Sequence, residues 1–178
     1  EYLDSRDDLD ITFSYEEEVL DTGGGLVYGL HTMPKNKPFY IINGDAFWVN
    51  SKTGLTLDQL REDWDGDQMD LLTLLHDKDN MYGTSGVGDY IIKEDGRVKR
   101  CPNQDGNYMF AGIRIAHPRI FEGYKPIKFS FLEIMDNTQN MGTHFAHVHQ
   151  GLWYHLSTPA DVAQLEEELK NGTVKEYA

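Results

Sequence analysis

Pro38–Asp45, with the sequence PFYIINGD, is the stretch that decides the fold. The four consecutive apolar or aromatic residues Phe39–Ile42 are typical of a strand that is covered on both faces. The run stops at a turn that ends in Asp45, so a carboxylate follows directly after a buried strand. Met69–His76 (MDLLTLLH) predicts a second strand of the same kind. Together they predict an α/β domain in which ligands bind where such strands end.

Outward from this stretch, strand and helix patterns alternate. Leu9–Ser14 (LDITFS) alternates in polarity and predicts a short strand, whereas Leu26–His31 predicts one or two helical turns. A helix is predicted over Leu57–Trp64, after the capping-box pair Thr56 and Gln59. The predicted order of elements between residues 9 and 76 is strand, helix, strand, helix, strand. This order predicts right-handed crossovers and a mainly parallel sheet. Later segments predict a hairpin (Asp89–Lys93 with Arg97–Arg100), a strand (Tyr108–Ile115) and a last helix capped by Thr158.

The composition excludes several classes of function. The chain has 178 residues, enough for one domain, and 16 basic against 30 acidic side chains give a net charge of −14. This charge excludes a passive nucleic-acid coat and electrostatic docking on an anionic membrane. A polyanionic ligand must therefore be received locally, by backbone N–H groups, a few cations or a metal. A single cysteine, Cys101, excludes an internal disulfide framework and predicts a reducing, cytoplasmic location.

Three segments carry residues suited to chemistry. Asp21–Gly25 (DTGGG) predicts a loop whose backbone can approach a flat ring or a phosphate, with a bare tight turn as the alternative. Asp45 is placed as a ligand for Mg²⁺, which prefers oxygen donors, although it could also cap the next element. In Gly151–Pro159 a strand runs into a capped helix, and polar residues, including His155, gather at the junction.

In combination, five segments resemble the sugar-1-phosphate nucleotidyltransferases. The resemblance is greatest to the branch that contains N-acetylmuramate-1-phosphate uridylyltransferase and mannose-1-phosphate guanylyltransferase-like enzymes. It runs over nearly the whole chain. The segments are Leu20–Gly25 (family E-T-G/A-G-G), Phe39–Asp45 (F-x-V-x-N-G-D), Gly88–Tyr90 (G-D-F), Tyr108–Ile115 with Pro118 (Y-x-F-T-G-I-x-I-x-x-P) and Gly151–Pro159 (G-x-W-x-D/H-V-G-T-P).

The resemblance implies a single domain over residues 1–178, an α/β Rossmann-like fold of three layers with a mainly parallel central sheet. It also implies an enzyme that joins a nucleoside triphosphate to a sugar 1-phosphate and releases pyrophosphate. UTP and N-acetylmuramate 1-phosphate are the expected pair. A mannose-1-phosphate guanylyltransferase and a non-catalytic module that binds sugar nucleotides are the alternatives. The sequence predicts no oligomeric state, and it does not fix the nucleobase or the sugar.

The resemblance also assigns roles to individual residues. The nucleotide subsite is the glycine-rich segment, Asp21, Thr22, Gly23, Gly24 and Gly25. The sugar subsite comprises Asn43, Gly88, Asp89, Gly112 and Trp153. Asp45 is the catalytic carboxylate that holds Mg²⁺ against the phosphates. His155 stands where many relatives have a second metal-binding Asp; because imidazole is a poorer ligand for Mg²⁺, Mn²⁺ or a phosphate oxygen is its alternative partner.

The sequence departs from the family pattern in one segment, and a cluster of histidines suggests a different function, zinc binding. The family's N-terminal segment, G-x-G-[ST]-R-x-x-P followed by P-K, has no match. We therefore expect a domain that lacks its N-terminal strand-loop-helix part and a chain that is inactive alone. His144, His147 and His149 form H-x-x-H-x-H, which could hold zinc, but without a cysteine we expect a surface strand.

Overall fold

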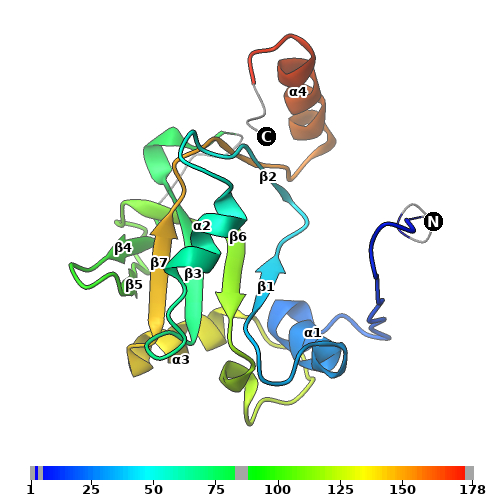
Figure 1. Cartoon of the computed structure of the whole chain (residues 1–178), viewed down its shortest axis with the longest axis vertical. Coiled ribbons are helices and arrows are strands. Elements are labelled where there is room, and N and C mark those ends of the chain that lie inside the picture. Colours follow the sequence, from blue (N-terminus) through cyan, green and yellow to red (C-terminus); the bar gives the residue numbers. More distant parts are fainter. Residues whose placement is uncertain (1–2, 4–5, 83–87, 175–178) are drawn as a thin grey trace.

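The computed structural model describes residue 3, residues 6–82 and residues 88–174 of the chain. Within them, four α-helices and eight strands alternate, with short 3₁₀ turns between some of them (Figure 1). The strands are β1 (Phe39–Ile42), β2 (Ala46–Trp48), β3 (Leu71–Asp77), β4 (Tyr90–Ile92), β5 (Val98–Arg100), β6 (Tyr108–Ala116), β7 (His144–Val148) and β8 (Trp153–His155). The helices are α1 (Asp21–Gly29), α2 (Thr56–Asp63), α3 (Leu132–Met141) and α4 (Pro159–Lys170). The 3₁₀ turns are η2 (Leu30–Thr32), η3 (Lys78–Asn80) and η4 (Pro118–Phe121).

The central sheet is mixed. Its strand order is β5-β4-β6-β3-β7, and β1 also pairs with β6. β3 and β7 are parallel, whereas β6 is antiparallel to β1, β3 and β4. In Figure 1, β1, β3 and β7 accordingly point one way and β6 the other. The pairing thus differs from the expected mainly parallel sheet. A strand buried on both faces has the same apolar pattern in either direction, so its sequence does not report its orientation.

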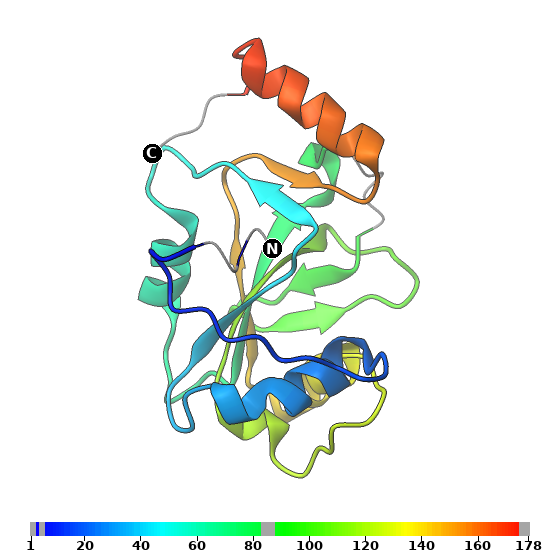
Figure 2. The same ribbon diagram turned by 90° about the vertical axis from the view of Figure 1, so that its right-hand side faces the viewer.

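Helices cover both faces of the sheet, which gives the three layers of an α/β fold. On one face, α1 and α3 lie next to each other and pack on Leu71, Leu75 and Phe131. On the other face, Leu60 of α2 is fully buried against Leu72 and neighbouring residues. Figure 2 shows α2 on the opposite side of the sheet from α1 and α3. Alternate residues of β3 therefore enter two different cores, as expected for a strand covered on both faces.

The antiparallel ribbon of β2 and β8 extends beyond the central sheet and carries α4, which lies at one end of the molecule (Figure 1). A third core of Val49, Tyr154, Leu165 and Val174 joins the ribbon to this helix. The predicted cap of α4 is confirmed: Thr158 accepts from the N–H of Asp161, whose carboxylate accepts from the N–H of Thr158. None of the helices in the described residues is long and apolar enough to cross a membrane.

Most predicted elements are confirmed, with four local differences. β1 is not covered on both faces as predicted, because the side chains of Tyr40 and Ile42 on one face are exposed. Leu9–Ser14 forms no strand; it runs without β-pairing, and the Leu9 and Phe13 side chains are more than half exposed. Thr22–Gly25 is not a loop but lies within α1. Thr56 is the first residue of α2 rather than its cap, and its hydroxyl instead donates to the Asn50 side chain.

Candidate functional site

Three adjoining clefts surround the turn that follows β1. The outer cleft, about 600 Å³, lies between α1 and the end of β1. The inner cleft, about 360 Å³, lies between β4–β6 and the start of α3. The small cleft, about 180 Å³, is bounded by β6 and β8. Asn43 lines all three clefts, so the three volumes meet at a single side chain.

The outer cleft brings the first two predicted segments together. Asp21, Thr22 and Gly25 line it from α1, and Asn43 and Asp45 line it from the end of β1. The glycine-rich segment and the predicted metal ligand therefore face a common crevice. The chain that precedes α1 also contributes to this wall, through Thr12, Ser14 and Glu16, which the sequence analysis did not single out.

The first two glycines of the triplet serve packing. The N–H groups of Gly23 and Gly24 both donate to the Phe129 carbonyl, at 3.0 and 3.2 Å. A Cβ on Gly24 would collide with the Ile127 carbonyl, and one on Gly23 would collide with the Phe129 ring. The N–H of Thr22 donates to the Asp21 side chain at 2.6 Å. These three donors are therefore used within the chain, and neither Gly23 nor Gly24 lines the outer cleft.

The small cleft brings Asp45 and His155 together. β2 and β8 pair so that Ala46 lies opposite His155, and the N–H of Leu156 donates to the Asp45 carbonyl at 2.8 Å. The imidazole of His155 stacks on Trp153, with ring centroids 5.8 Å apart. Trp153 is buried, and its indole N–H donates to the Ala111 carbonyl at 2.8 Å. The ribbon thus places His155 and the exposed Asp45 on the wall of the same cleft.

Gly112 shapes the wall shared by β1 and β6. Its φ of +79° lies in the left-handed region that favours glycine. A Cβ there would lie 3.3 Å from Cβ of Asn43. The N–H of Asn43 donates to the Gly112 carbonyl at 2.8 Å, which ties the turn after β1 to the middle of β6.

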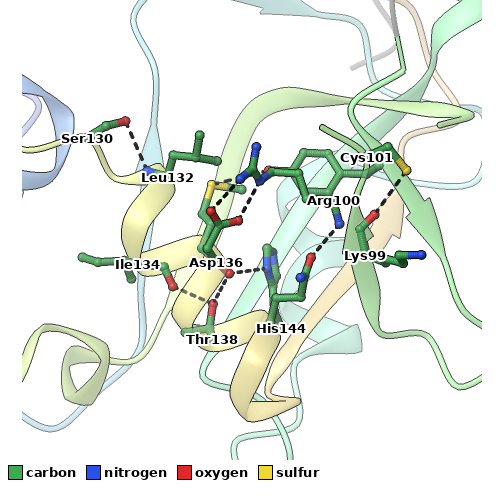
Figure 3. Close-up of polar contacts among 12 residues, drawn as sticks. Lys99, Arg100, Cys101, Ser130, Leu132, Ile134, Asp136, Thr138 and His144 are labelled. Carbon is green, nitrogen blue, oxygen red and sulfur yellow. Dashed lines mark hydrogen bonds and ion pairs between the residues drawn. The ribbon is translucent and has the colours of Figure 1, made fainter. Parts of the chain in front are cut away.

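Asp89 and Arg100 face the inner cleft. Burial raises the pKa of the Asp89 carboxyl, and the nearby Arg100 opposes that rise. Arg100 is held by Asp136 of α3 through two contacts of 2.7 Å, drawn in Figure 3. Gly88, predicted in the same subsite, lines none of the three clefts; it packs against the Gly106 backbone with a φ of +68°.

Arg114 is a site residue that sequence reasoning missed. It projects from β6, is only 3 % exposed and lines both the outer and the inner cleft. One of its terminal nitrogens donates to Oδ1 of Asn43 at 2.9 Å. The sequence feature that could have identified Arg114 is that it is the single charged residue within the apolar run YMFAGIRIA.

His144 and His147 lie in β7 and His149 directly follows it, but the three side chains do not meet at one point. His144 is buried and bonds to Thr73 and to the Met135 carbonyl, and burial lowers its pKa to about 3. His147 contacts Asp63 at 2.6 Å, whereas His149 lines a separate hollow of about 860 Å³. That hollow shares no lining residue with the three clefts. In the described ranges, no three metal-binding side chains gather, and His144 and His149 are buried rather than at the surface.

The fold is shared with solved structures, although no family model matches the chain. A UDP-glucose pyrophosphorylase complexed with UDP-glucose is 15 % identical with a TM-score of 0.66, over 88 % of this chain and 64 % of that one. HddC from Yersinia pseudotuberculosis, complexed with GMP-PN, is 22 % identical with a TM-score of 0.63, over 86 % and 64 %. The inositol-1-phosphate CTP transferase from T. maritima is 13 % identical with a TM-score of 0.58, over 88 % and 65 %.

The chain spans less than two thirds of the length of these structures. At such identities the likeness establishes the fold, and the activity has to be argued from the site. The expected α/β architecture is therefore confirmed: the chain has the three-layer fold that these pyrophosphorylase and CTP transferase structures share.

Proposed function

We propose that this domain transfers a nucleotidyl group from a nucleoside triphosphate to a sugar 1-phosphate, with UTP and N-acetylmuramate 1-phosphate as the substrates. The observation that carries the proposal is the position of Asp45. It lines the outer cleft together with Asp21, Thr22 and Gly25, and it lines the small cleft together with His155. A carboxylate at the junction of two clefts suits a reaction that joins two phosphates. The shared fold supports the same class of activity.

The donor set at this junction fits a magnesium ion that a substrate helps to bind. Mg²⁺ commonly takes one or two protein carboxylates and completes its octahedron with water and substrate phosphates. Asp45 is exposed and would supply the carboxylate, while His155 would supply an imidazole nitrogen, a donor that also suits Mn²⁺. The ion would neutralise phosphate charge where the two substrates meet.

The chemistry requires positioning more than an activated side chain. A phosphate oxygen of the sugar 1-phosphate forms a bond to the α-phosphorus of the triphosphate. The bond from that phosphorus to the oxygen bridging to the β-phosphate breaks, and pyrophosphate leaves with the electron pair. Alignment of two reactants can lower the barrier by roughly 7–11 kcal/mol. Asn43, which borders all three clefts, would help to hold the two reactants in register.

The test is release of pyrophosphate by the complete protein, screened over pairs of nucleoside triphosphate and sugar 1-phosphate. Asp45→Asn keeps the shape of the side chain but removes the charge that would hold the metal. We expect it to abolish release while the melting temperature stays unchanged. Asp67→Asn, at an exposed carboxylate outside the three clefts, is the matched control and should behave as the unmodified protein.

Full activity of Asp45→Asn would overturn the metal role of this residue. Binding of a UDP-sugar without pyrophosphate release from any pair would instead identify the domain as a non-catalytic module. A preference for GTP with mannose 1-phosphate would replace the proposed substrates and leave the reaction class intact.

A further inference from the structure

Arg114 is a buried cation at the wall between the outer and inner clefts. Its side chain is 97 % removed from solvent, yet it lines both volumes. Thr22 and Asn43 are the other residues common to the two clefts. Burial of a charge is costly unless the charge is paired and hydrogen-bonded. The contacts of this guanidinium therefore decide whether its charge is satisfied within the fold.

The contacts leave much of the guanidinium without an acceptor. Arginine carries five N–H donors. Nη2 donates to Oδ1 of Asn43 at 2.9 Å, and Nη1 lies 3.7 Å from the sulfur of Met135, which is a weak acceptor. Among the described residues, Nε has no hydrogen-bond partner, and Arg114 has no carboxylate within ion-pair distance. Nε is itself buried, so an acceptor that enters a cleft would pair with the remaining donors of the terminal nitrogens Nη1 and Nη2.

The surroundings hold the guanidinium in place and keep it charged. The rings of Phe110 and Phe131 lie 4.6 and 4.2 Å from its central carbon. Cation–π contacts of this kind fix the plane of the group without neutralising it. Burial lowers the pKa of Arg114 to about 10, so the side chain still carries its charge at neutral pH. Replacement of buried charges by apolar side chains is often neutral or stabilising. The buried charge of Arg114, which has no carboxylate partner among the described residues, therefore points to an anionic ligand.

Arg114 lines the outer cleft together with Asp45, and it also lines the inner cleft, which neither proposed metal ligand lines. The proposed metal ligands Asp45 and His155 share the small cleft, which Arg114 does not line. The inner cleft, which it does line, also offers Asp89 and Gln104, polar side chains suited to sugar hydroxyl groups. An anion that Arg114 holds from the inner cleft therefore lies on the sugar side of the site.

We propose that Arg114 binds a carboxylate carried by the sugar, so that the domain selects acidic sugar 1-phosphates over their neutral counterparts. This inference rests on the proposed function, because it assigns the inner cleft to the sugar. The planar fork of a guanidinium matches a carboxylate through two parallel hydrogen bonds. Asn43, which already accepts from Nη2, orients the fork. Arg114 is thus a specificity-determining residue.

The experiment compares matched sugar phosphates by calorimetry on this chain with MgCl₂ present. One pair is glucose 1-phosphate and glucuronic acid 1-phosphate, and the other is N-acetylglucosamine 1-phosphate and N-acetylmuramate 1-phosphate. In at least one pair we expect the acidic member to bind about 10- to 100-fold more tightly, the range for a hydrogen bond to a charged group. Arg114→Met should remove that preference, because the acidic member should lose more affinity than the neutral one.

Two further variants control for folding. Arg97→Met also removes an arginine that stacks on a phenylalanine, but Arg97 is paired with Asp95 and lies outside the three clefts, so the preference should persist. Arg114→Lys keeps the charge without the fork and should retain part of the preference. Melting temperatures identify any variant that fails to fold, and Arg114→Lys still tests the inference if Arg114→Met is one of them.

Three results would overturn the inference. Equal affinity within both pairs for the unmodified chain would show that it recognises no carboxylate. An equal loss of affinity for both members in Arg114→Met would assign Arg114 to the anomeric phosphate, with the proposed function intact. No binding of any of the four compounds would count against the proposed function as well as the inference.

Discussion

Gly112 sets the shape of the site through its backbone. Its φ of +79° bends β6, and its carbonyl accepts from the N–H of Asn43 at 2.8 Å. Close to this bend, the register between β3 and β6 shifts between Thr73 and Leu75. The side chain that borders all three clefts is therefore positioned by a residue that has no side chain.

Gly112→Ala should destabilise the fold and weaken ligand binding. A left-handed φ costs a non-glycine residue about 1–2 kcal/mol. The added methyl would also press on Cβ of Asn43 at 3.3 Å and on that of Ala46 at 3.4 Å. Gly123→Ala is the matched control, since its φ is +84° and no atom lies within 4 Å of the new Cβ. Urea denaturation should show a larger loss of unfolding free energy for Gly112→Ala, and equal losses would contradict this account.

Individual site residues differed in how well the sequence could predict them. Asp45 follows the apolar run Phe39–Ile42, and the structure places it on a cleft with Asp21 and Thr22. Arg114 was not predicted, because alternation along a strand marks its position as core, and charged residues are rarely buried without a partner. Its role depends on Asn43 and on Phe131, which are distant in sequence and meet it only in the folded chain.

At the scale of elements, α1 shows how packing overrides intrinsic propensity. Three consecutive glycines disfavour a helix, yet Asp21–Gly29 is helical. Gly23 and Gly24 let the helix approach the segment that carries Phe129, whose carbonyl accepts from both N–H groups. Close approach of two backbones compensates for the poor helix propensity, and sequence periodicity does not report such a contact.

Two substitutions within α1 separate packing from propensity. Gly24→Ala should destabilise the protein by about 1–3 kcal/mol, because its methyl would collide with the rigid Ile127 carbonyl. Gly29→Ala adds the same methyl to the same helix, but its nearest neighbour is Oγ of Ser14 at 3.5 Å. That variant should be neutral or more stable, by up to about 1 kcal/mol. Thermal unfolding of both variants is the measurement, and a stabilised Gly24→Ala would refute the packing explanation.

The elements predicted best have a clear apolar stripe or a local cap. α4 satisfies both conditions, whereas α2 has the apolar stripe without a side-chain cap. The hairpin of β4 and β5 is marked by the turn residues between its strands. Leu9–Ser14 has a strand-like pattern but finds no pairing partner among the described residues. Alternation of apolar and polar residues shows that a segment is suited to a sheet edge. Whether the segment pairs depends on a neighbouring strand, which a local sequence pattern cannot specify.

At the scale of the whole molecule, the net charge of −14 repels the ligands that the clefts are proposed to bind. We expect the association rate constant of UTP to rise a few-fold between 0.01 and 0.15 M KCl, because the screening length falls from about 30 to about 8 Å. Stopped-flow tryptophan fluorescence would follow this change, with uncharged uridine as the control. A rate constant that falls with salt would mean that the field at the clefts is positive.

Asn43 forms part of the wall of all three clefts, and its amide oxygen already accepts from Arg114. An occupant of any one cleft therefore meets a surface that the other two clefts share. By thermodynamic linkage, whatever one occupant does to the affinity of a second, the second does equally to the affinity of the first. Order of addition would then leave the final saturation unchanged, and Asn43 is the described residue that occupants of all three clefts would meet.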